Sequence, residues 1–171
     1  MTHTVDPDGE VVLLDLLNTT PVAADGPTDL LADDAAAAAW ARARGGVGSA
    51  AEATHLRRVR DRLQAVVRGA EPASALGPAL RGVRLVPDID GTGLCWRLDT
   101  DDDRRLAARA LLAWGRVQER LPGRLRPCAN DECHLFLLDR SRPNTARWCS
   151  MKVCGNRLKA RRHYQRSQQG G

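Results

Sequence analysis

The chain has 171 residues, of which 43% are hydrophobic and 27% charged, a composition that excludes an intrinsically disordered protein. Only 4% are aromatic, so we expect a core of Leu, Val and Ala, which favours helices. The charge is uneven, because residues 124–171 hold nine Arg and two Lys against three acidic residues, a net +8, whereas residues 1–123 carry a net −3.

Neither a secretory signal nor a membrane span is indicated. The first twenty residues contain four acidic residues and no basic stretch, which is unlike a signal peptide. No apolar run approaches the ~20 residues that a membrane-spanning helix needs. We therefore expect a cytoplasmic protein with no membrane partner, in which thiols stay reduced. Five cysteines in that compartment favour metal or redox chemistry over a disulfide framework.

The N-terminal third of the chain predicts two elements. Residues 10–17, "EVVLLDLL", are a continuous apolar stretch and form either a short helix or a buried strand, which periodicity alone does not distinguish. After a segment rich in Gly, Pro and Asp, Thr28 or Asp29 is the expected cap of a helix that runs to about Arg44.

The next segment predicts a long helix followed by a short one. Ser49 is the expected N-cap of the long helix, and Gly69 its end. Apolar residues recur along it at spacings of three and four, which makes one buried face: Leu56, Val59, Leu63, Val66 and Val67. A shorter helix is expected over residues 72–81.

A β-hairpin and a final long helix complete this part. In residues 82–98, "GVRLV" and "LCWRL" flank the turn-forming "PDIDGTG". Thr100 or Asp101 then caps a helix with acidic residues in its first turn, where the helix dipole favours them. Its predicted buried stripe is Leu106, Ala110, Trp114, Val117 and Leu121. Pro122-Gly123 ends the helix where the charge changes sign, so we place a domain boundary there, between residues 1–123 and residues 124–171.

Four of the five cysteines form two pairs with the same spacing. Cys128 and Cys133 are separated by four residues, as are Cys149 and Cys154, and fifteen residues lie between the pairs. The intervening segment is typical of a strand, an Arg-Pro-Asn turn and a second strand, which would return the second pair to the first. Four thiolates then surround one zinc ion, with no open position for a substrate, so the metal is expected to be structural.

Residues beside the second pair support a metal site. Ser150 is a plausible N-cap for a helix that starts at Met151, and Asn156 is expected to donate its amide to a thiolate or a carbonyl next to the metal. Two alternatives remain open, namely four separate structural thiols and an iron–sulfur cluster. Cys95 lies far from the four and is interpreted as a buried apolar side chain.

The segment that contains these cysteines resembles the CGNR zinc-finger family. The match rests on both cysteine pairs, on "RWCSM" (147–151) and on "CGNR" (154–157). In that family the finger follows a mainly helical domain, ABATE, whose start carries Leu-Asp-x-x-Asn-Thr, and "LDLLNT" (14–19) matches it. The resemblance implies a mainly α protein with a small β-hairpin (α+β), followed by a treble-clef-like zinc finger of hairpin and helix. It also implies a stress-induced transcriptional regulator.

The basic end is expected to bind nucleic acid, with DNA as the partner. No acidic residue follows Asp139, and a helix after Cys154 would present a basic surface that neutralises phosphates. The candidate contacts are Lys152, Arg157, Lys159, Arg161, Arg162 and Arg166. The competing interpretation is a solvated basic tail that binds nothing specific.

The helical part has one polar cluster of interest. Asp15, Asn18 and Thr19 either cap and turn the chain before Pro21 or contact a small-molecule effector. No catalytic triad order, paired carboxylates or phosphate-binding glycine loop is found, so we do not expect an enzyme. The alternative function is a small-molecule-binding protein or enzyme whose helical domain carries the activity. Four residues are expected in the core: Trp40, His55, Trp96 and Trp114.

Overall fold

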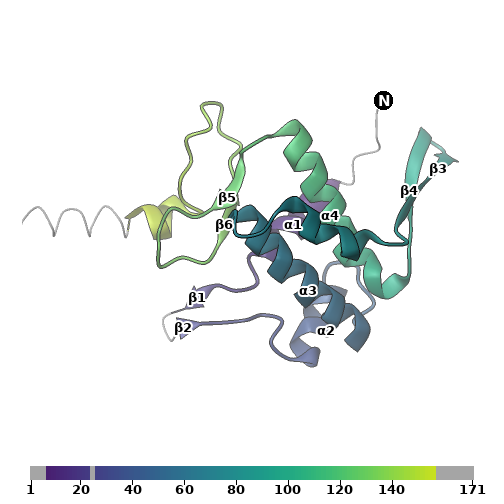
Figure 1. The fold of residues 1–171 in the computed structure, drawn as a ribbon, viewed down its shortest axis with the longest axis horizontal. Coiled ribbons are helices and arrows are strands. Elements are labelled where there is room, and N and C mark those ends of the chain that lie inside the picture. Colours follow the sequence, from purple (N-terminus) through teal and green to yellow (C-terminus); the bar gives the residue numbers. More distant parts are fainter. Residues whose placement is uncertain (1–6, 24–25, 157–171) are drawn as a thin grey trace, which may run out of the picture.

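A computed structural model describes residues 7–23 and 26–156 (Figure 1). Four helices form its centre, and the prediction of a mainly helical protein with small hairpins is confirmed. They are α1 (Pro7–Leu17), α2 (Asp34–Arg42), α3 (Ala50–Val67) and α4 (Asp102–Arg120). Helix α4 packs against both α1 and α3, and α2 packs against α3. None of the helices in the described ranges is long and apolar enough to cross a membrane.

The apolar stretch at residues 10–17 is helical, not a strand. It lies in α1, where Leu13, Leu16 and Leu17 are buried against the other helices. The buried stripes predicted for α3 and α4 are largely confirmed, since the core is lined by Leu56, Val59, Leu63, Leu106, Ala110 and Val117. With Ala113, which is also buried, these residues recur every three or four positions, so each helix turns one face inward.

The predicted start of the second helix is wrong. Helix α2 begins at Asp34, and Asp33 is its cap, with a side-chain oxygen that accepts a hydrogen bond from the Ala36 N–H at 2.8 Å. Asp29 instead accepts from the Leu31 N–H and pairs with the guanidinium of Arg60. Asp29 and Asp33 are both suitable cap residues. Asp29 pairs with the buried Arg60, which requires a carboxylate partner, and Asp33 caps the helix.

The cap predicted for α3 is confirmed. The Ser49 hydroxyl accepts from the Glu52 N–H at 3.0 Å, and the buried Glu52 carboxylate accepts from the Gly48 N–H at 2.6 Å. The position of Glu52 also explains why residue 46 is a glycine, although its φ is not positive. A Cβ atom on Gly46 would lie 2.5 Å from the Glu52 carboxylate.

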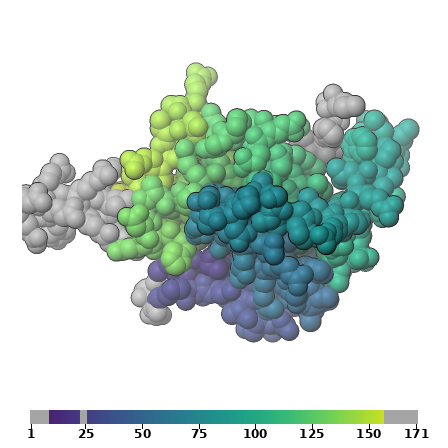
Figure 2. Space-filling model, viewed as in Figure 1, coloured from purple at the N-terminus to yellow at the C-terminus, as the bar shows by residue number. Residues whose placement is uncertain are grey.

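The short helix predicted after α3 is present, but its turns are tighter than those of an α-helix. The short helix η1 (Ala73–Leu80) is a 3-10 helix that contains Pro78. The expected β-hairpin is present as β3 (Arg84–Asp90) paired antiparallel with β4 (Gly93–Asp99). It projects from the body of the molecule (Figure 2). Trp96 on β4 is therefore 37% exposed and not in the core as predicted, because the hairpin that carries it stands away from the centre of the helices.

The remaining strands are short. Strand β1 (Val22–Ala23) pairs with β2 (Gly26–Pro27), and β5 (Leu125–Pro127) pairs with β6 (Phe136–Leu138). The strand–turn–strand predicted between the cysteine pairs is wrong in its second half. Its first strand is β6, but β6 pairs with β5, which precedes the first cysteine, and no strand follows the turn within residues 139–156.

The C-terminal hairpin shares the core of the helices. Leu125 on β5 and Phe136 on β6 belong to the same buried cluster as the side chains of α1, α3 and α4. In the space-filling view the green residues of this region pack directly on the helices (Figure 2). That residues 1–123 and 124–171 are separate domains thus stays a prediction. The buried core contains residues from both sides of residue 123.

Candidate metal centre

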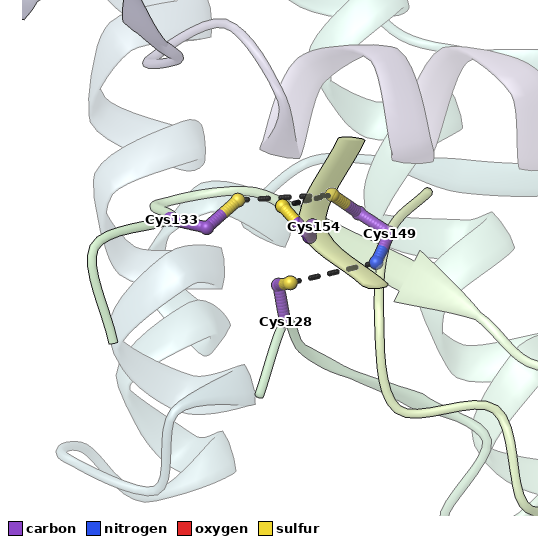
Figure 3. Close-up of side chains that lie close together, drawn as sticks. All are labelled: Cys128, Cys133, Cys149 and Cys154. Atoms are coloured by element: carbon purple, nitrogen blue, oxygen red, sulfur yellow. Dashed lines mark hydrogen bonds between the residues drawn. The ribbon is translucent and has the colours of Figure 1, made fainter. Parts of the chain in front are cut away.

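Four cysteine side chains converge beside the C-terminal hairpin (Figure 3). Cys128 follows β5, Cys133 precedes β6, Cys149 ends the long loop, and Cys154 lies in η2 (Met151–Gly155), a single π-helical turn. All four sulfur atoms lie within 4.8 Å of one another, and Cys128 and Cys154 are buried. The sequence prediction that the two pairs meet is therefore confirmed.

The spacing of the sulfurs fits a single tetrahedral ion. Zinc–thiolate bonds of ~2.3 Å place the corners of a tetrahedron about 3.8 Å apart. Cys149 Sγ lies 3.7 Å from the sulfurs of both Cys133 and Cys154. Four thiolates are also the ligand set of structural zinc sites, in which every coordination position is taken by protein. The cluster is one zinc site, and zinc held there organises the fold without an open position for a substrate.

Ionisation of all four thiols depends on a bound cation. Burial raises the pKa of Cys133 to about 11, and burial together with the thiols of Cys133 and Cys154 raises that of Cys149 far above its ordinary range. Burial opposes ionisation of Cys154 too, but hydrogen bonds from Asn130 and the neighbouring thiols outweigh it and lower the pKa. Four thiolates this close repel one another, so zinc must supply the compensating charge.

The backbone fixes each cysteine in place. The Cys128 N–H donates to the Leu135 carbonyl at 2.8 Å, which joins the two ends of the first pair. The Ser150 hydroxyl caps η2 by accepting from the Val153 N–H, as predicted, and the Cys149 N–H points at the sulfur of Cys128 at 3.5 Å.

An asparagine beside the metal was predicted, but the structure places a different one in contact with a sulfur. Asn130 is 1% exposed, and its side-chain Nδ2 donates to Cys154 Sγ at 3.7 Å. Asn156, the residue chosen from the sequence, is exposed at the end of η2. The loop "CANDEC" holds three polar residues, and Asp131 and Glu132 are exposed, so the sequence alone did not distinguish Asn130 from its neighbours.

A buried carboxylate that sequence reasoning did not single out organises the long loop. Asp139 accepts from the N–H groups of Ser141 and Ala146, both at 2.8 Å, and pairs with Arg126 at 2.6 Å. The side chain and N–H of Ser141, the Ala146 N–H and Arg126 together lower the pKa of Asp139 to about 2, against the opposing effect of burial. Arg126 also donates to Asn144, whose φ is +52°. These contacts replace the missing strand and return the chain to Cys149.

The polar cluster at the start of the chain makes contacts within the protein. Asn18 accepts from the Phe136 N–H at 2.7 Å and donates to the Phe136 carbonyl at 3.2 Å, so its amide pairs with the open edge of β6 as a neighbouring strand would. Thr19, fully buried, donates to the Leu16 carbonyl, and Asp15 pairs with Arg44 at 2.8 Å. These partners favour the structural interpretation of the cluster.

A second contact links the helices to the finger. Arg68, at the end of α3, lies over the Phe136 ring at 4.3 Å and donates to the His134 carbonyl at 2.8 Å. Phe136 is thus held through its backbone by Asn18, which follows α1, and through its ring by Arg68, which follows α3. Because Leu135, its neighbour, bonds to Cys128, the helices set the position of the first cysteine pair.

Most of the predicted nucleic-acid contacts lie outside the described residues. Lys152 is exposed on η2, next to the metal site. The other five positions lie beyond residue 156: Arg157, Lys159, Arg161, Arg162 and Arg166.

Comparison with protein families assigns nearly the whole chain. Residues 10–135 match a family described as "Putative stress-induced transcription regulator" (ABATE), and residues 124–167 match the CGNR zinc finger. The two matches overlap over residues 124–135, the stretch that contains β5 and the first cysteine pair. No curated protein matches the chain.

Proposed function

The chain belongs to the ABATE family of transcription regulators and carries a CGNR zinc finger, and from this premise we propose that it binds DNA through the finger and senses a small effector through its helices. The observation that carries the proposal is the closed four-cysteine site from which the most basic part of the chain continues. A metal with four thiolate ligands shapes the finger and leaves recognition to the protein's own side chains.

The charge of the finger supports nucleic acid as its partner. Residues 124–171 carry a net +8 with neutral thiols, and four thiolates with one Zn²⁺ lower this to +6. Such a module gains affinity by displacing the counterions of phosphates. Lys152, Arg157, Lys159, Arg161, Arg162 and Arg166 are the proposed contacts. Residues 1–123 carry a net −3, so the excess positive charge of the chain is concentrated in the finger.

The finger and the helices are proposed to act together. Asn18 and Arg68 hold β6, so a change in how α1 and α3 pack would reach the zinc site through one strand. A small molecule bound among the helices would therefore alter DNA affinity only if it bound two conformations of this contact with different affinities.

A second function is supported by one observation. The helical region contains a cavity of about 380 Å³ between α3, η1 and α4, a size that suits small-molecule ligands. A small-molecule-binding protein or enzyme with a purely structural finger would use the same cavity. In the DNA-binding regulator the basic residues of the finger bind the ligand, whereas in the small-molecule-binding protein or enzyme they contribute to no activity.

Binding to duplex DNA over a range of salt concentrations tests the proposal. We expect log affinity to fall linearly with log salt, with a slope of about −0.9 for each phosphate contacted. The Arg161→Ala/Arg162→Ala double variant should bind more weakly and show a slope about two units shallower. The matched control is Arg84→Ala/Arg120→Ala, which removes the same charge from exposed positions on β3 and α4.

Each outcome separates the two functions. A loss of affinity confined to the Arg161/Arg162 variant supports the regulator. Absent or salt-insensitive binding by the zinc-loaded wild type, or an equal loss in both double variants, rejects the finger as a DNA-binding module and favours the second function. Single-stranded RNA of the same length, measured in parallel, identifies the nucleic acid.

A further inference from the structure

The cavity among the helices is lined by basic side chains. His55, Arg58 and Arg62 lie on one face of α3, at spacings of three and four, and Arg104 faces them from α4. Val59, Ala107 and the Pro78–Ala79 segment of η1 supply the apolar part of the wall. The lining residues include no acidic side chain.

These arginines differ from several other arginines in and beside the helices. Arg44, Arg57, Arg60 and Arg105 each form an ion pair with an aspartate. Among the residues that the structure describes, no carboxylate pairs with Arg58, Arg62 or Arg104. Three like charges that converge on a concave, half-apolar site without a counterion raise one another's electrostatic energy. An anion placed among them would remove this cost.

Two of the guanidinium groups are held in position by the backbone. Arg62 Nη1 donates to the Ala75 carbonyl at 2.7 Å, and Arg104 Nη2 donates to the Ala79 and Arg81 carbonyls at 3.0 and 2.8 Å. Each of these two guanidinium groups uses one nitrogen in these bonds. Its other nitrogens donate to no acceptor among the described residues. A fixed guanidinium with free N–H groups is suited to planar, bidentate recognition of an oxyanion.

We propose that this cavity, formed by His55, Arg58, Arg62 and Arg104, binds a phosphorylated small molecule. Three arginine charges exceed what one carboxylate neutralises, whereas a phosphate monoester carries about −1.5 to −2 charges and offers three acceptor oxygens. The cavity volume of about 380 Å³ leaves room for an organic group beside the phosphate, against Val59 and Ala107.

The site would connect to the finger through α3. Arg62 is less than two turns from Arg68, which holds Phe136 and His134 of the C-terminal region. A ligand that draws α3, η1 and α4 together therefore acts on the helix that positions the metal-bearing hairpin. The role of the ligand as an effector rests on the proposed regulator function, whereas its binding does not.

Binding of inorganic pyrophosphate to the full-length zinc-loaded protein tests the site. Isothermal titration at constant ionic strength should show one pyrophosphate per chain, and citrate, a polycarboxylate, should bind more weakly. Arg58 is exposed and makes no hydrogen bond or ion pair with the described residues, so we expect Arg58→Glu to fold and to weaken pyrophosphate binding at least tenfold. Arg84→Glu, on the projecting hairpin, makes the same charge change and should bind as the wild type does.

Several results overturn the proposal. They are the absence of pyrophosphate binding at millimolar concentration, equal affinities in Arg58→Glu and Arg84→Glu, or tighter binding of citrate. If duplex DNA displaces pyrophosphate and Arg58→Glu weakens DNA binding as strongly, the cavity is part of a nucleic-acid surface and not a small-molecule site. Zinc content measured after each titration excludes metal removal as the source of heat. A protein that binds pyrophosphate but no DNA retains this site and loses only the regulator function.

Discussion

Replacing Asn18 by Ala tests whether the helices hold the metal-bearing hairpin in place. The change removes two hydrogen bonds, of 2.7 and 3.2 Å, and leaves the N–H and carbonyl of Phe136 without their partner. An unsatisfied buried polar group costs about 1–3 kcal/mol, and both bonds are only partly buried, so we expect a loss of about 2 kcal/mol. For a chain of this length that loss lowers the melting temperature by roughly 4–8 °C.

The same loss should speed the release of zinc. If β6 must detach from α1 before a chelator reaches the cysteines, a loss of about 2 kcal/mol raises the open population, and hence the release rate, by up to about 30-fold. The assay is the rate at which the zinc-loaded protein transfers its metal to an excess of a chelating dye, alongside the melting temperature.

Gln64→Ala is the matched control. Gln64 donates to the Leu17 carbonyl at 2.8 Å and to the Thr20 hydroxyl at 2.9 Å, so its loss removes two bonds next to Asn18 but wholly within the helical region. We expect a similar fall in melting temperature and a much smaller change in zinc release. Equal release rates in the two variants would refute the idea that Asn18 couples the helices to the metal site.

Three further predictions concern the finger. The purified protein should contain about one zinc per chain, and Cys154→Ser should abolish stable binding, because three thiolates remain where four close the site; elemental analysis that finds iron or no metal contradicts this. Asn130→Ala should release zinc faster than the wild type, since it removes the donor to Cys154 Sγ, and the same assay on Asn156→Ala tests the sequence-based expectation for that residue. A chain that ends at Gly123 should remain helical by circular dichroism but melt at a lower temperature, because it lacks Phe136; melting at the wild-type temperature would show that the shared core contributes little.

Much of this protein follows from local sequence. The caps at Ser49 and Ser150, the β3–β4 hairpin and the buried faces of α3 and α4 depend on neighbouring residues, so turn chemistry and periodicity predict them. The metal ligands could also be predicted from local sequence, since two C-x4-C pairs allow few arrangements once they bind one ion.

Only the tertiary structure decided how distant segments meet. Asn18 and Phe136 lie 118 positions apart, so no local pattern reveals that an asparagine side chain completes the edge of β6. Likewise, Asp29 was expected to cap a helix but pairs with the buried Arg60. Asp139 organises a loop where a strand was predicted. The basic cavity arises because η1 brings Arg62 and Arg104 together from two helices. In each case a buried or half-buried polar group found its partner in a distant part of the chain, where local sequence patterns give no information.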